Sequence, residues 1–216
     1  MKIKAFIVLL IVSACAFIAG WQNAYDDTLL EEVEEETGIV PYARWFRQYA
    51  PQIGWDWETL AAVAYHESRF NPQACSPQGA KGLMQIMPRT AVRYGLNDST
   101  IMVPKDNIEA SAKFFSFLQR QFAFVGDSTE QTKFVLAAYN AGPAHIHDAR
   151  RLARKYGANP YRWEDVEVYM MKLSEEEYYT DSVVLFGAFN AWETQRYVRG
   201  VMHTRARLIK ESKQAQ

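Results

Sequence analysis

Apolar residues recur at helical spacing through most of the chain after Gly38, whereas the strict alternation of a half-buried strand is hard to find. Asp56 predicts an N-cap for a helix over residues 57–70, which Asn71-Pro72 ends. A loop rich in Gly, Pro and Ser follows over residues 73–82, and such loops often carry a functional site. The fold class predicted is mainly α, with further helices at residues 89–94, 107–122, 129–141, 144–156, 163–173 and about 185–210.

The first 20 residues have the layout of an export signal. Lys2 and Lys4 precede a continuous apolar run over residues 5–19, broken only by Ser13. Residues 12–15, Val-Ser-Ala-Cys, resemble a bacterial lipobox, which makes Cys15 a candidate lipidation site. An uncleaved anchor over residues 3–21 and a cleaved signal that releases a soluble protein are the alternatives. We therefore expect an exported, periplasmic protein anchored to a membrane, and an outer-membrane lipoprotein is one form of this.

Composition and charge then set the domain organisation. A chain of 216 residues that is 49% hydrophobic supports one good core. The predicted order is a signal or anchor at 1–20, an acidic tether at 21–37, one folded domain at 38–210 and a polar tail at 211–216. The formal net charge of −1 hides a segregation, because residues 37–216 contain 22 Lys and Arg against 18 Asp and Glu, or +4. This mild balance predicts no nucleic-acid partner.

Glu67 is the candidate catalytic residue of the predicted helix at residues 57–70. A carboxyl group within an apolar stripe loses hydration, which raises its pKa and keeps a proton available for general acid catalysis. The alternative is that Glu67 pairs with an arginine and only anchors the loop that follows. The stripe is defined by steps of three and four residues and consists of Leu60, Val63, Ala64, Glu67 and Phe70.

No metal or cofactor is expected from the sequence. His66-Glu67 would begin a zinc-protease motif, but the second histidine that this motif needs is replaced by Phe70. His145 and His147 are two residues apart and point to different faces of a helix. Neither a glycine-rich phosphate loop nor a Gly-x-Ser-x-Gly elbow is present. Cys75 is expected to be a packed loop thiol.

Four ordered blocks of sequence resemble one enzyme family. They are residues 66–72 (HESRFNP), 76–88 (SPQGAKGLMQIMP), 137–143 (AAYNAGP) and 193–198 (ETQRYV). Together they resemble the lytic transglycosylases with the soluble-lytic-transglycosylase catalytic domain, over roughly residues 38–208. The stretch between the third and fourth blocks is most similar to the catalytic domain of the membrane-bound lytic transglycosylase F group.

The resemblance implies a lysozyme-like single domain with a cleft that binds the glycan strands of peptidoglycan. It also implies cleavage of the β-1,4 bond between N-acetylmuramic acid and N-acetylglucosamine without water, which leaves a 1,6-anhydro end. Glu67 matches the family's catalytic glutamate and would act first as acid and then as base. The residues that match substrate-binding positions are Ser76, Gln85, Met87, Tyr139, Asn140, Glu193 and Tyr197.

Several alternatives stay open at the level of sequence. Asn140 could be a structural amide or a sugar-binding one. Glu193 and Tyr197 are four residues apart on one helix face, and a packed tyrosine with an ion-paired glutamate is their other interpretation. For the whole domain, a goose-type hydrolase and a non-catalytic peptidoglycan-binding module are the competing functions.

Overall fold

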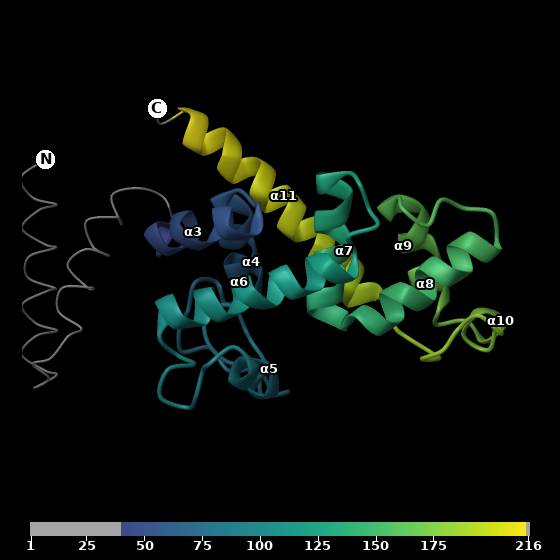
Figure 1. Ribbon diagram of the computed structural model, residues 1–216, viewed down its shortest axis with the longest axis horizontal. Coiled ribbons are helices and arrows are strands. Elements are labelled where there is room, and N and C mark those ends of the chain that lie inside the picture. The colour runs from purple at the N-terminus through teal and green to yellow at the C-terminus, as the bar shows by residue number, and fades with distance from the viewer. Residues whose placement is uncertain (1–39, 215–216) are drawn as a thin grey trace, which may run out of the picture. The chain divides into compact units, whose positions relative to one another are not determined.

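The computed structural model of the protein describes residues 40–214, which form helices joined by irregular loops (Figure 1). The predicted signal, its Cys15 and the acidic tether lie outside the described residues. The chain divides into a unit of residues 1–42 and a unit of residues 43–216, and all described helices belong to the second. In chain order these are α3 Ala43–Tyr49, the 3-10 helix η1 Ala50–Ile53, α4 Trp57–Ser68, α5 Pro88–Arg93, α6 Pro104–Gln121, α7 Ser128–Ala141, α8 Pro143–Lys155, α9 Trp163–Lys172, α10 Glu176–Tyr179 and α11 Trp192–Gln214.

The mainly α prediction is confirmed for the part of the chain that the structure describes. No strand occurs within residues 40–214, and the β-contacts there are isolated bridges from Lys81 to Cys75 and Ile86. None of the helices in this range combines the length and the apolar character needed to cross a bilayer.

Two predicted helix starts are wrong, and both have a local cause. Helix α6 begins at Pro104, three residues before Asn107, because proline suits the first helical position. The last helix begins at Trp192 and not near Leu185. The buried carboxylate of Asp148 accepts the backbone N–H groups of Leu185 and Phe186 at 2.7 and 2.8 Å, which holds this segment in a loop. The helix then continues to Gln214, into the predicted polar tail.

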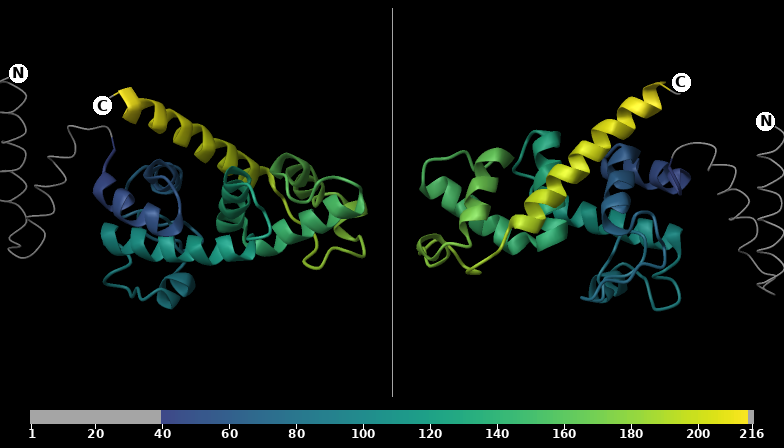
Figure 2. Two further views of the ribbon diagram at one scale, coloured as in Figure 1. Left: turned by 45° about the horizontal axis from the view of Figure 1, so that its top comes forward. Right: turned by 180° about the vertical axis from the view of Figure 1, so that it is seen from behind.

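The long helix α11 contacts helices from both the earlier and the later part of the chain. It packs against α4 and α7, and Figure 2 shows it running obliquely past both. Helix α8 packs on α7 and α9, while α6 packs on α7 and α3. Burying a large apolar side chain contributes about 1.5–3 kcal/mol relative to exposure. The largest fully buried side chains include Phe46, Phe115, Phe122, Phe134, Leu60, Met84, Ile108 and Leu136.

A smaller apolar cluster fixes the loop region between α4 and α6. It buries one face of α5 against Ala110 of α6, with Tyr94 and Met102 at its edge. This cluster ties the chain that follows the Gly/Pro/Ser-rich loop to the main helices. Its buried members are Ile86, Ala91, Leu96, Ile101 and Ala110.

Candidate active site

Helix α4 places Glu67 at its final turn. Asp56 caps the helix as expected, since its carboxylate accepts the backbone N–H of Thr59 at 2.8 Å. The helix ends at Ser68, two residues earlier than predicted, because Arg69 and Phe70 adopt left-handed backbone conformations with φ of 55° and 61°. The other helical members of the predicted stripe, Leu60, Val63 and Ala64, are completely buried. Glu67 is partly buried at the open end of that stripe.

Burial dominates the electrostatics of Glu67. Although the residue as a whole keeps some exposure, desolvation of its carboxyl group raises the pKa to about 7, from an ordinary value of 4.5. The Tyr197 hydroxyl opposes this shift and lowers the pKa. No carboxylate among the described residues contributes to the shift. Glu67 can therefore hold its proton near neutral pH, as its place in the apolar stripe predicts.

Two partly buried tyrosines flank Glu67. The Tyr139 ring stacks on Phe115 with centroids 4.3 Å apart, and its hydroxyl donates to the Met84 carbonyl oxygen at 2.6 Å. The Tyr197 hydroxyl is buried near the Glu67 carboxyl without forming a hydrogen bond of good geometry. Burial, and then the charge of Glu67, raises the pKa of both phenols. Both hydroxyls therefore stay protonated and can only donate or accept hydrogen bonds.

Ser76 and Gln85 shape the loop that follows α4. The Ser76 hydroxyl oxygen accepts the backbone N–H of Ala80 at 3.0 Å and closes a tight turn. Gln85 has a left-handed backbone with φ of 50°. Its side-chain amide donates to the carbonyl oxygens of Ala74 at 3.0 Å and Gly82 at 2.8 Å. The Gln85 side chain thus braces the loop through its nitrogen, and its oxygen is the group left for a ligand.

The other predicted binding residues differ in their surroundings. Met87 precedes α5 and is 44% exposed, so its side chain is available to a ligand. The Asn140 amide oxygen accepts the Thr194 hydroxyl at 2.7 Å, which joins α7 to α11. Glu193 is exposed in the first turn of α11, four residues before Tyr197. The amide oxygen of Asn140 thus has a structural role, and its amide nitrogen is the group that could bind a ligand.

His66 secures the contact between α4 and α11. Its Nε2 is hydrogen-bonded to the Thr204 hydroxyl at 2.9 Å, and Gly200 approaches the imidazole ring closely. Burial and the neighbouring charge of Arg69 lower the pKa of His66. His66 therefore packs as a neutral ring between helices, next to Glu67 in sequence.

One expectation about the loop is wrong. Cys75 is exposed and free, not packed, because it lies in the short bridge with Lys81 at the loop surface. Across residues 40–214, no three His, Cys, Asp or Glu side chains are grouped as they would be around a metal ion.

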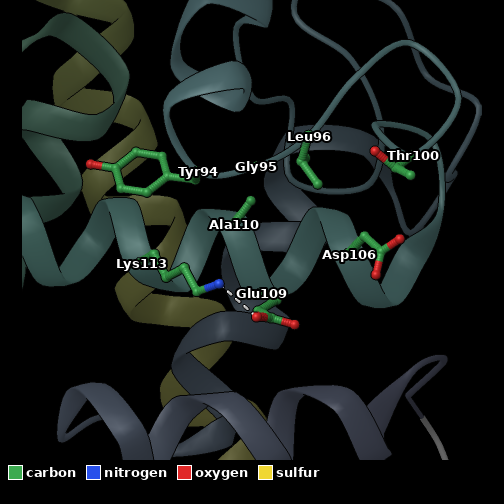
Figure 3. Close-up of a pocket in the computed structure, with 8 residues that line it drawn as sticks. All are labelled: Tyr94, Gly95, Leu96, Thr100, Asp106, Glu109, Ala110 and Lys113. Atoms are coloured by element: carbon green, nitrogen blue, oxygen red, sulfur yellow. Dashed lines mark hydrogen bonds and ion pairs between the residues drawn. The ribbon is translucent and has the colours of Figure 1, made fainter.

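Two cavities of about 320 Å³ lie apart from Glu67 and its tyrosines. Figure 3 shows the first, between the α5–α6 connection and one face of α6, where Lys113 and Glu109 are paired at 2.6 Å. The second lies beside the ion pair of Asp56 and Arg205 at the opposite end of α4. Neither cavity is lined by a residue that the sequence singled out for the reaction.

The sequence motifs missed Asn107. This asparagine is completely buried in α6 and holds the backbone of the loop that carries Gln85, through hydrogen bonds to Lys81 and Met84. The sequence pattern predicts that Asn107 begins the helix. The signal that could have identified it is Pro104, which places the helix start earlier and leaves an amide in the second turn facing the core.

Comparison with known proteins agrees with the helical domain. The Transglycosylase SLT domain family matches residues 44–161. Membrane-bound lytic murein transglycosylase F of Marinobacter nauticus is 35% identical over 174 residues, which are 81% of this chain and 34% of the relative. Its namesake from Serratia proteamaculans is 39% identical over 179 residues, 79% of this chain and 35% of the relative. The chain thus spans about a third of the length of these curated relatives.

The fold also has a solved counterpart. The 70 kDa soluble lytic transglycosylase SLT70 of Escherichia coli aligns with a TM-score of 0.52 and 25% identity, over 80% of this chain and 24% of that one. The domain is therefore of the lysozyme-like helical class. The chain belongs to the Transglycosylase SLT domain family. The matched region contains Glu67, Ser76, Gln85, Met87, Tyr139 and Asn140, whereas Glu193 and Tyr197 lie beyond it.

Proposed function

We propose that the protein is a peptidoglycan lytic transglycosylase that cleaves the β-1,4 bond between N-acetylmuramic acid and N-acetylglucosamine without water. The observation that carries the proposal is the partly buried carboxyl group of Glu67, whose pKa burial raises to about 7. A group that is half protonated near neutral pH can both give and take a proton there. Relatives named lytic murein transglycosylases support the choice of substrate.

The reaction needs one carboxyl group in two successive roles. Glu67 first donates its proton to the glycosidic oxygen as the bond to the anomeric carbon breaks. The resulting carboxylate then takes the proton of the sugar's own 6-hydroxyl, whose oxygen closes on the anomeric carbon. Glu67 ends protonated, and the products are a free 4-hydroxyl and a 1,6-anhydro ring. A retaining hydrolase of the usual kind would instead place a second carboxylate about 5–5.5 Å away, and no carboxylate within residues 40–214 contributes to the pKa of Glu67.

The neighbouring residues have supporting roles in this proposal. Tyr197 stabilises the carboxylate that forms after proton donation, because its hydroxyl favours the charged form. We assign Ser76, Gln85 and Met87 of the loop, with Tyr139 and Asn140 of α7, to binding of the sugar. Glu193 belongs to the same substrate-binding set, from the first turn of α11.

A pair of variants on one helix tests the role of Glu67. Glu67→Gln keeps the shape but removes the transferable proton, so the variant should fold and lose peptidoglycan solubilisation by about a thousandfold or more. Glu58→Gln is the matched control, because Glu58 is a buried acid of the same helix that accepts a hydrogen bond from Ser212 instead. Equal activity of the Glu67 variant and the wild type would favour a non-catalytic binding module.

We also propose that the protein is exported and held at a membrane by residues 1–20, with Cys15 as the lipidated residue. The support is the apolar run, the lipobox-like residues 12–15 and the membrane-bound relatives. Metabolic labelling with a palmitate analogue should mark the wild type and not a Cys15→Ala variant. Equal labelling of the two proteins would exclude Cys15.

A further inference from the structure

The backbone of residues 81–84 is held by side chains from three helices. Ser68 of α4 donates its hydroxyl hydrogen to the Leu83 carbonyl oxygen at 2.7 Å. Tyr139 of α7 donates to the Met84 carbonyl oxygen at 2.6 Å. Asn107 of α6 forms hydrogen bonds with the backbone of Lys81 and Met84 in the same segment. The loop next to Glu67 is therefore fixed by long-range hydrogen bonds and not by regular secondary structure.

Asn107 makes the largest share of these bonds. Its Oδ1 accepts the backbone N–H of Met84 at 2.8 Å, and its Nδ2 donates to the carbonyl oxygens of Ile101 at 2.7 Å and Lys81 at 3.2 Å. Both amide hydrogens and the amide oxygen are thus used, and the side chain is completely buried. Replacing it would leave the Met84 N–H and the Ile101 carbonyl without a partner in the interior.

The contact with Gly82 shows how closely the loop lies on Asn107. A Cβ atom at position 82 would lie 2.4 Å from Asn107 Nδ2 and 2.6 Å from the Ile101 carbonyl oxygen. Gly82 also has a φ of 79°, which glycine adopts without strain. The glycine of the motif is therefore required by the asparagine behind it, 25 residues further along the chain.

Asn107 connects this anchor to the reacting groups through Met84. The N–H of Met84 is bound by Asn107, while its carbonyl oxygen fixes the hydroxyl of Tyr139, the tyrosine near Glu67. The next residue, Gln85, has the left-handed backbone that turns its side chain into the loop. A shift of Met84 would move Tyr139 on one side and Gln85 on the other.

We propose that Asn107 is a positioning residue for substrate binding, which sets the places of Gln85 and Tyr139 through the backbone of Met84. This inference rests on the proposed function, because it needs a sugar that binds at Gln85 and Tyr139. Asn107 itself touches no substrate in this arrangement. Its contribution is to hold the loop in the one conformation that binds the glycan.

The test measures binding without turnover. A tetrasaccharide of alternating N-acetylglucosamine and N-acetylmuramic acid is titrated by calorimetry into Glu67→Gln and into the same protein with Asn107→Leu, well below both melting temperatures. Asn107→Leu keeps the volume and removes all three hydrogen bonds, so we expect affinity to fall about tenfold or more. Leu118→Ala, a cavity variant of the same helix, is the control for lost stability and should bind like the parent.

A second variant covers the case in which Asn107→Leu does not fold. Asn107→Asp keeps the acceptor for Met84, but at about pH 8 it carries a buried charge that cannot donate, whereas near pH 5 the protonated acid donates one hydrogen bond. We expect its affinity relative to the parent to recover as the pH falls. The proposal is overturned if folded Asn107→Leu binds within about twofold of the parent, if Leu118→Ala loses affinity equally, or if Asn107→Asp binds like the parent at both pH values.

Failure of this inference and failure of the proposed function give different results. If the Glu67→Gln parent binds no tetrasaccharide and the wild type releases no anhydro product, the proposed function is wrong. If the parent binds and the wild type cleaves, but the Asn107 variants bind normally, only the positioning role is wrong.

Discussion

Glu67 owes its proton affinity to the place where α4 ends. The apolar face of the helix removes water from the carboxyl group, and the left-handed residues Arg69 and Phe70 turn the chain away immediately after it. Within the part of the chain that the structure describes, the hydroxyl that favours its charged form is that of Tyr197. These two opposing effects set a pKa of about 7 and define what each neighbour should change.

Tyr197→Phe should move the alkaline limit of activity to higher pH. The Tyr197 hydroxyl lowers the pKa of Glu67, so removing it raises that pKa and keeps the acid protonated further into the alkaline range. The measurement is the pH profile of kcat/KM for peptidoglycan solubilisation. An unchanged alkaline limit would mean that the hydroxyl does not act on Glu67.

Glu67 should also make stability fall as the pH rises. Between pH 4.5 and about 7 the unfolded chain releases the proton that the folded protein keeps, so the folded state loses relative stability over this window. Glu67→Gln has no such loss. The difference in unfolding free energy, variant minus wild type, should therefore be larger at about pH 8 than at about pH 4, by up to about 3 kcal/mol. Urea unfolding at the two pH values gives the difference, and a constant difference would contradict the raised pKa.

At the scale of elements, the contact between α4 and α11 is tighter than the sequence suggests. Gly200 lies inside α11, and a Cβ atom there would meet His66 Cε1 at 2.5 Å. Alanine at a helix interior is usually worth about 1 kcal/mol over glycine, but this clash should outweigh that gain.

Gly200→Ala should therefore destabilise the protein by about 1–2 kcal/mol. His66 can yield only by giving up its hydrogen bond with Thr204. Gly126→Ala is the control, because nothing lies within 4 Å of its added Cβ atom. The check is the melting temperature of each variant, and a stabilised Gly200→Ala protein would show that the helices are free to separate.

The loop before α11 depends on Asp148. Its buried carboxylate binds the N–H groups of Leu185 and Phe186 and pairs with Arg151, whose Nε donates to the Val183 carbonyl oxygen at 2.7 Å. This loop presents Leu185 and Phe186 to solvent at 69% and 57% exposure. Without the carboxylate, two backbone donors and a guanidinium would lose their common partner.

Asp148→Ala should cost about 2–4 kcal/mol and open this loop to proteolysis. Chymotrypsin should then cut after Leu185 or Phe186 faster than in the wild type, as followed by mass spectrometry under native conditions. Asp98→Ala, at a side chain that is 97% exposed, should leave the cleavage rate unchanged. Equal resistance of Asp148→Ala and the wild type would show that other contacts hold the loop.

Local patterns predicted the parts of the site that depend on neighbours in sequence. Helical spacing placed Glu67 in an apolar stripe, and Asp56 capped the helix as a short polar residue should. Asn107 and Asp148 could not be found in this way, because their partners lie 23 and 37 residues away and are backbone groups. The sequence around a backbone N–H or carbonyl group does not indicate which distant side chain will form a hydrogen bond with it.

For the whole molecule, the charge segregation complements the proposed substrate. Residues 37–216 carry a net +4 by sequence, while the acidity is concentrated between Asp26 and Glu36. Peptide stems of peptidoglycan carry carboxylates, so a mildly basic domain favours their approach. Screening over about 8 Å at physiological salt confines this effect to encounter more than to affinity.

Digestion of peptidoglycan in water enriched in heavy oxygen tests the role of Glu67 most directly. In the proposed reaction the Glu67 carboxylate takes the proton of the 6-hydroxyl, and no water attacks the anomeric carbon. The muropeptides released by the wild type will therefore be one water lighter than hydrolysis products and will carry no heavy oxygen. Glu67→Gln will release none of them, and Glu58→Gln will release the same set as the wild type. Reducing ends labelled with heavy oxygen would identify a hydrolase and contradict the proposed function.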